Sequence, residues 1–174
     1  MTIQGHATTS PQVKVQPTKP APPRPDLRSL YVNQLLRGVK DEPSIHYMQL
    51  RPIPQRYQLP MRTDCSGYVT VSAQVSGCPD PNGRHFDGQG YTGTLLDHCA
   101  HVPFTAVRPG DLIVYGNHPG HHVVAVTALV RDNLGRVTDF MVVSHGQEKG
   151  PATILHSVEQ QYQPFPANYL SFLP

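Results

Sequence analysis

The hydrophobic pattern of this chain changes from helical spacing to β-rich runs after Pro109-Gly110, and this change restricts the fold class most strongly. Before this point, apolar residues at helical spacing predict a helix that begins after Pro25-Asp26 and ends near Gly38. Two further helices are predicted, from Cys65 to about Val75 and from Thr92 to Cys99. After it come β-rich runs bounded by turn signals, at 111–115, 122–130, 138–144 and 152–155. Helices followed by antiparallel strands predict an α+β domain.

Two segments before Cys65 lack such a pattern. Residues 1–25 are rich in Pro, Thr and Gln and carry basic residues but no acid, so they cannot bury enough apolar surface to offset their chain entropy. They are predicted to form a disordered basic arm, with the folded domain spanning 26–174. Residues 43–63 contain several prolines and are predicted to be irregular, with one helical turn around Ile45 to Leu50.

Composition narrows the function classes. The 174 residues fit one domain with a real core, and a net charge of +2 without a basic stripe argues against nucleic-acid binding. Three cysteines without CxxC spacing argue against a disulfide framework. Cys78 and Cys99 could pair in an oxidising setting, but small apolar residues are the simpler interpretation. The chain begins without a signal-peptide pattern, has no apolar run of membrane-spanning length, and indicates no cofactor.

The segment Asp64-Cys65-Ser66-Gly67, followed by the apolar stretch 68–71, places a cysteine where a loop passes into a helix. Unpaired backbone N–H groups and the helix dipole at such a junction favour a thiolate over a thiol. A thiolate is a nucleophile, and the backbone N–H of the same residue can stabilise an oxyanion. The segment therefore predicts covalent catalysis, although a cysteine before an apolar helix, taken alone, is more often a core residue.

Two strands carry histidines that are candidates for the base and for its orienting partner. His121 and His122 are adjacent, so on a strand they face opposite sides and only one can point at Cys65. His122 opens an alternating apolar run, which favours it over His121. His145 ends the next strand and would lie beside His122 if the hairpin pairs near Asn133, where it would hold the His122 ring in the required tautomer.

Three blocks in this order, 64–68, 108–112 and 122–126, resemble the NlpC-type cysteine peptidase family. The resemblance covers most of residues 43–156. It implies a papain-like α+β fold, in which a helix-borne cysteine packs on an antiparallel sheet. It also implies hydrolysis of peptide-stem bonds in bacterial cell walls, often between D-glutamate and diaminopimelate. Segments 90–96 and 144–151 are similar to those of phage-encoded members from actinobacterial hosts, in lysins and tail proteins.

The resemblance also assigns roles to single residues. Cys65 is by this resemblance the nucleophile and His122 the base, and His145 is the third polar residue of a Cys-His-His triad. Gln147 is a rival for the third position.

Substrate contacts follow from the same resemblance. Asp64 and Ser66 match positions that help recognise the stem peptide. Tyr47 matches an upstream tyrosine that assists the oxyanion, although the Trp-Gly-Gly that follows it in the family is absent here.

The protein is therefore expected to be a peptidoglycan endopeptidase, and two alternatives stay open. One is a non-catalytic virion or wall-binding module of the same fold. The other is a zinc-dependent amidase, since His118, His121, His122 and His145 could bind zinc, but no H-E-x-x-H motif is present. We expect synthesis in a host cytoplasm and action at the cell wall after phage-type release or within a virion. The basic arm is a candidate tether to wall polymers or to virion or lysis partners; a plain leader is the simpler interpretation.

Overall fold

The computed structural model describes residues 26–146 and 150–174, so the predicted arm 1–25 and Gln147 lie outside the described residues. The helical elements are α1 (Leu27–Lys40), α2 (Cys65–Val75), α3 (Thr92–His98) and α4 (His156–Tyr162), with 3-10 turns at Glu42–Ser44 and Phe104–Ala106. The strands are β1 (Ile45–Tyr47), β2 (Met61–Thr63), β3 (Ala100–His101), β4 (Leu112–Tyr115), β5 (His122–Arg131), β6 (Val137–Ser144), β7 (Ala152–Leu155) and β8 (Ala167–Ser171).

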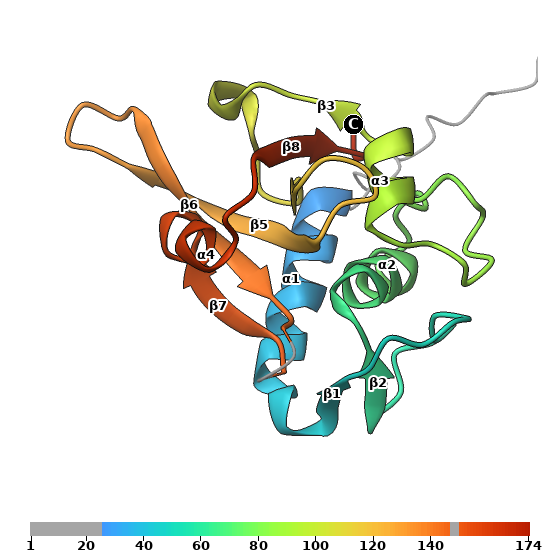
Figure 1. Cartoon of the computed structure of the whole chain (residues 1–174). Coiled ribbons are helices and arrows are strands. Elements are labelled where there is room, and N and C mark those ends of the chain that lie inside the picture. Colours follow the sequence, from blue (N-terminus) through green and yellow to red (C-terminus); the bar gives the residue numbers. More distant parts are fainter. Residues whose placement is uncertain (1–25, 147–149) are drawn as a thin grey trace, which may run out of the picture.

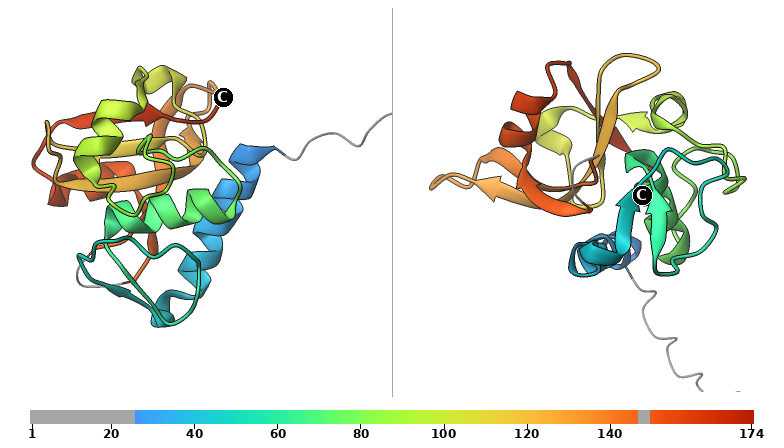
Figure 2. Two further views of the ribbon diagram at one scale, coloured as in Figure 1. Left: turned by 90° about the vertical axis from the view of Figure 1, so that its right-hand side faces the viewer. Right: turned by 60° about the horizontal axis from the view of Figure 1, so that its bottom comes forward.

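Six of the strands form one antiparallel sheet, in the order β3-β8-β4-β5-β6-β7. The strand nearest the C-terminus, β8, therefore lies inside the sheet, between β3 and β4 (Figure 1). The remaining two strands, β1 and β2, pair in parallel at the end of the molecule next to α2, apart from the large sheet (Figure 2). The predicted α+β class is confirmed.

The large sheet is covered on both faces, and strand alternation decides which residue faces which layer. On one face, Val123, Ala125 and Val143 pack in the cluster that includes the buried residues of α1 and α2. On the other face, Val124 and Val142 belong to a second cluster with Tyr115 and Phe140. Figure 1 shows α2 beside β5 and α4 beside β6 and β7.

Buried polar contacts join α1 to the large sheet at the start of β4. The Arg28 guanidinium of α1 lies 2.8 Å from an Asp111 carboxylate oxygen, and this side chain of Asp111 is almost completely buried. The same arginine donates to the carbonyl of Leu173 at 2.8 Å, while the second oxygen of Asp111 accepts the backbone N–H of Arg108. These bonds fasten α1 and the last described residues to the turn that begins β4.

The structure departs from the sequence expectation in two ways. The helical turn expected around Ile45 to Leu50 is wrong, because 45–47 form strand β1 against β2. The elements β2, β3, α4 and β8 come from parts of the chain where no helix or strand was predicted. Within the described ranges, no helix is long and apolar enough to cross a membrane.

Candidate active site

The helix start predicted at Cys65 is present, and Asp64 is its N-cap. The Asp64 carboxylate accepts the backbone N–H of Gly67 at 2.7 Å, which satisfies one of the donors that a helix start leaves without an intrahelical partner. Only glycine fits at 67, since a Cβ there would collide with the hydroxyl of Thr63. Cys65 thus occupies the first helical position, where its own N–H is not used by the helix.

A cleft of about 350 Å³ opens in front of this helix start. Its walls combine β1 and the loop after it, the first turn of α2, the start of α3, and the turn before β5. The lining residues are Tyr47, Gln49, Arg51, Asp64, Cys65, Ser66, Tyr91, Thr92, Gly120 and His121. The cysteine is 6 % exposed, so the cleft is the route by which a substrate can reach its sulfur.

His122 connects the cysteine to a carboxylate on the far side of the imidazole. Its imidazole lies close enough to the Cys65 thiol for the two groups to interact. Its Nε2 atom lies 2.9 Å from the hydroxyl of Ser144 and 3.3 Å from a carboxylate oxygen of Glu159 on α4. Ser144 in turn donates to the same oxygen of Glu159 at 3.3 Å. Because Nε2 is directed at these two groups, Nδ1 is the ring nitrogen left for the cysteine.

The charges of His122 and Glu159 stabilise each other, as the pKa shifts of both groups indicate. Burial lowers the pKa of His122, but hydrogen bonds to Cys65 and Glu159, and the negative charge on each, raise it to about 9. Burial also raises the pKa of Glu159, yet its hydrogen bond to His122 and the imidazolium charge hold that pKa below the usual value. The arrangement therefore favours an imidazolium paired with the Glu159 carboxylate at neutral pH.

The other predicted histidine, His145, takes a different position. Its Nε2 lies 3.0 Å from the carbonyl oxygen of Thr63, and its ring contacts those of Tyr47 and Tyr68, with centroids 5.5 and 5.6 Å away. The groups at Nε2 of His122 are Ser144 and Glu159. We therefore give the orienting role, expected for His145, to Glu159 as part of the function proposed below.

The strand register explains this exchange. In the β5–β6 ladder, Val124 is paired with Ser144. Residues two apart on a strand share a face, so His122 and Ser144 lie on the side of Val124, where α4 packs. His145 follows Ser144 and turns to the opposite side, where Tyr68 of α2 lies. The register of this strand pair thus determines that Ser144, and not the adjacent His145, lies at the imidazole of His122.

The remaining histidines near the cleft have separate surroundings. The ring of His121 stacks on Phe165, with centroids 3.8 Å apart and planes within 3°, while His118 lies 3.5 Å from the carboxylate of Asp97. The zinc alternative required His118, His121, His122 and His145 to converge. Over residues 26–146 and 150–174, no group of three or more His, Cys, Asp or Glu side chains is placed to hold a metal ion.

The residues expected to contact substrate all line the cleft. Tyr47 is brought there by β1, whose parallel pairing sets it opposite Thr63, two residues before Cys65. The hydroxyl of Ser66 donates to Asp64 at 2.9 Å. Asp64 also forms a 3.0 Å ion pair with Arg51, whose guanidinium donates to Ser66 at 3.0 Å as well.

Sequence reasoning did not identify Glu159, Ser144 or Arg51. Glu159 belongs to a short helix with no predicted element around it, and Arg51 lies in a loop assigned as irregular. Ser144 alone could have been found from the sequence, because it directly precedes His145 on a predicted strand. The register of the hairpin then decides whether Ser144 or His145 points toward His122.

Solved structures provide the comparison with known proteins. The peptidoglycan hydrolase RipB from Mycobacterium tuberculosis superposes with a TM-score of 0.52 at 18% identity, covering 87% of this chain and 69% of RipB. A Staphylococcus aureus protein described as similar to a lipoprotein of the NLP/P60 family gives a TM-score of 0.52 at 15% identity, covering 90% of this chain and 45% of that protein.

Sequence-level comparisons add nothing to these structural ones. No family model matches the chain. No curated protein matches it either. At the identities found among solved structures, the likeness concerns the fold. The structural neighbours of this chain are NlpC/P60 proteins, and its helices and antiparallel sheet have their papain-like arrangement.

Proposed function

We propose that this protein is a cysteine endopeptidase that hydrolyses peptidoglycan stem peptides, at the bond between D-glutamate and diaminopimelate. The observation that carries the proposal is the position of His122, whose ring interacts with the Cys65 thiol and has its Nε2 atom 3.3 Å from the Glu159 carboxylate. This is the arrangement of nucleophile, base and orienting group that acyl transfer requires. The peptidoglycan substrate is inferred from the fold shared with RipB, a peptidoglycan hydrolase.

In the proposed reaction, the Cys65 sulfur attacks the scissile carbonyl carbon, and the carbonyl oxygen becomes an oxyanion. The backbone N–H of Cys65 stabilises this oxyanion, and Tyr47 lines the same cleft as a second candidate donor. The His122 imidazolium then gives its proton to the departing amine, which breaks the C–N bond and leaves a thioester on Cys65. His122 next takes a proton from water, whose oxygen attacks the thioester and releases the new carboxylate and the cysteine.

The proposal is tested by incubating the purified protein with peptidoglycan and identifying released fragments by mass spectrometry. We expect new pairs of ends, a glutamate carboxylate and a diaminopimelate amine, and loss of this release after alkylation with iodoacetamide. Release that survives alkylation but is lost with EDTA would instead support a zinc amidase. Binding to peptidoglycan without any released peptide would support a non-catalytic module. The route by which the protein reaches the cell wall, and its origin in a phage, stay predictions.

Glu159→Gln should shift the pH dependence of hydrolysis. The imidazolium of His122 is stabilised by the Glu159 charge, so removing that charge lowers the pKa of His122 from about 9. Activity at alkaline pH, which needs the protonated ring, should therefore begin to fall at lower pH, by about one to two units, because a hydrogen bond to a charged group is worth roughly 1.5–3 kcal/mol. The measurement is kcat/KM between pH 6 and 10.

A matched control separates this electrostatic effect from loosening of α4. Asp139 anchors the same helix by accepting hydrogen bonds from the backbone and hydroxyl of Ser157. Asp139→Asn should lower thermal stability while leaving the alkaline limb where it is in the unmodified protein. If both variants moved the limb equally, Glu159 would be a structural residue only.

A further inference from the structure

The cleft in front of Cys65 contains one ion pair, and its two members are unequally exposed. Among the described residues that line the cleft, Arg51 and Asp64 are the only side chains of the Arg, Lys, Asp or Glu type. The side chain of Asp64 is 9 % exposed, whereas that of Arg51 is 28 % exposed. A substrate that enters the cleft therefore meets the cation before it meets the anion.

Both carboxylate oxygens of Asp64 already accept hydrogen bonds from groups of the protein. One carboxylate oxygen accepts the backbone N–H of Gly67 and the hydroxyl of Ser66, at 2.7 and 2.9 Å. The other oxygen accepts the Arg51 guanidinium at 3.0 Å. An ammonium group on a substrate would have to approach a carboxylate whose charge is already compensated, past a guanidinium that repels it.

Arg51 retains capacity for a ligand. Within the described residues its guanidinium donates to the carbonyl of Leu50 at 2.6 Å, to Asp64, and to Ser66 at 3.0 Å. A guanidinium has five N–H donors in a planar fork that matches a carboxylate. The guanidinium contacts Ser66, which directly follows Cys65, and Arg51 lines the same cleft as the nucleophile.

We propose that Arg51 is a specificity-determining residue that binds a substrate carboxylate beside the scissile bond, and that the cleft needs no free amino terminus on the stem peptide. The proposal rests on the function proposed above and names its substrate more closely. When glutamate is linked through its side-chain carboxyl, its α-carboxylate stays free a few bonds from the scissile carbonyl. A stem peptide still joined to glycan, and so acylated at its amino terminus, would be accepted.

Four synthetic stem peptides test both parts of the proposal. They combine an α-carboxylate or an α-carboxamide on glutamate with a free or an acetylated amino terminus, and kcat/KM is measured for each by chromatography of the products. With the unmodified protein, amidation should lower kcat/KM by about tenfold or more, because a charge-assisted hydrogen bond is lost. Acetylation should change it by less than about threefold.

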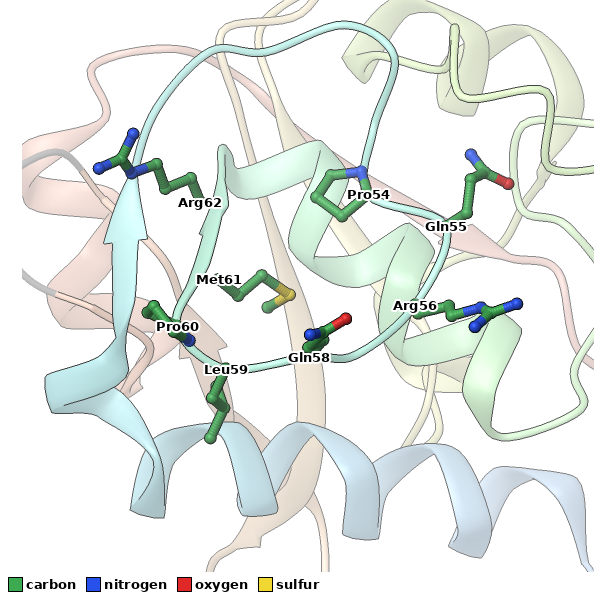
Figure 3. A pocket seen from close by; sticks show the side chains of 8 residues that line it. All are labelled: Pro54, Gln55, Arg56, Gln58, Leu59, Pro60, Met61 and Arg62. Atoms are coloured by element: carbon green, nitrogen blue, oxygen red, sulfur yellow. The ribbon is translucent and has the colours of Figure 1, made fainter.

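The Arg51 assignment is tested with variants by comparing ratios between peptides, so that a general loss of activity does not obscure the result. Arg51→Gln should reduce the carboxylate preference to about threefold or less, and Arg51→Lys should retain an intermediate preference because it keeps the charge without the fork. The matched control is Arg56→Gln, in the same loop. Arg56 lines a separate cavity of about 410 Å³, formed by residues 54–56 and 58–62, where Arg56 and Arg62 lie on opposite sides (Figure 3). This control should keep the full preference.

Each failure has a distinct meaning. Equal cleavage of the carboxylate and carboxamide peptides by the unmodified protein, or an unchanged ratio in Arg51→Gln, would overturn the role of Arg51 while leaving the endopeptidase intact. Loss of cleavage on acetylation would show that Asp64 binds an ammonium after all. Cleavage of none of the four peptides would defeat the proposed function, and the specificity proposal with it.

Discussion

Cys65→Ala should abolish release of stem peptides from peptidoglycan while the protein stays folded. The proposed reaction has no nucleophile without the sulfur, and loss of a residue that acts as part of a catalytic unit costs roughly 10³- to 10⁶-fold in rate. Folding should survive because the residue is small and its helix remains capped by the Asp64 carboxylate, which does not involve the sulfur. Released peptides are quantified by mass spectrometry, and folding is followed by circular dichroism and thermal melting.

The other cysteines supply the control for this variant. Cys78 is buried, and burial raises the pKa of its thiol to about 11, so it is a poor nucleophile at neutral pH. Cys78→Ala should keep the hydrolytic rate of the unmodified protein and its inactivation by iodoacetamide. Peptide release by Cys65→Ala at an undiminished rate would refute the proposed nucleophile, whatever the behaviour of Cys78→Ala.

His122→Ala should be nearly as inactive, because both proton transfers of the proposed reaction pass through its ring. General acid–base catalysis contributes roughly 10²- to 10⁴-fold, and this variant also removes the cation that faces Cys65. The adjacent His121 provides the matched variant. Its ring stacks on Phe165, so His121→Ala should retain most turnover.

Steady-state kinetics with a stem peptide distinguishes the two histidines. In His122→Ala the loss should appear in kcat, since the ring acts on the reacting atoms, whereas any loss in His121→Ala should appear mainly in KM because His121 lines the cleft. A larger fall in kcat for His121→Ala than for His122→Ala would show that the wrong ring was assigned as the base.

The elements that the sequence predicted well are those with a local signal. The helix from Cys65 to Val75 begins at an aspartate cap, and the strands of the β5–β6 hairpin differ from their predicted ranges by a single residue at an end. The pairing of β1 with β2 was missed because three residues gain their strand conformation from a partner at Met61–Thr63, after a proline-rich loop. No short-range pattern encodes such a contact.

The candidate site divides in the same way. Cys65 and His122 lie at the start of a helix and of a strand, positions that motifs and alternation can locate. The partner of His122 depends on a register between two strands and on the packing of α4 against β6, both of which are tertiary properties. The motif resemblance therefore pointed to His145, while the structure brings Glu159 and Ser144 to the imidazole.

The position of β8 inside the large sheet has a consequence for biosynthesis. A chain leaves the ribosome from its amino terminus, so the gap between β3 and β4 stays unfilled until residues 167–171 emerge. The carboxylate proposed to steady the imidazole is also made late, on α4. Nascent chains and fragments that end before residue 156 would carry the sulfur and the ring without the elements that align them, so the proposed activity would require α4 and β8 to have been made.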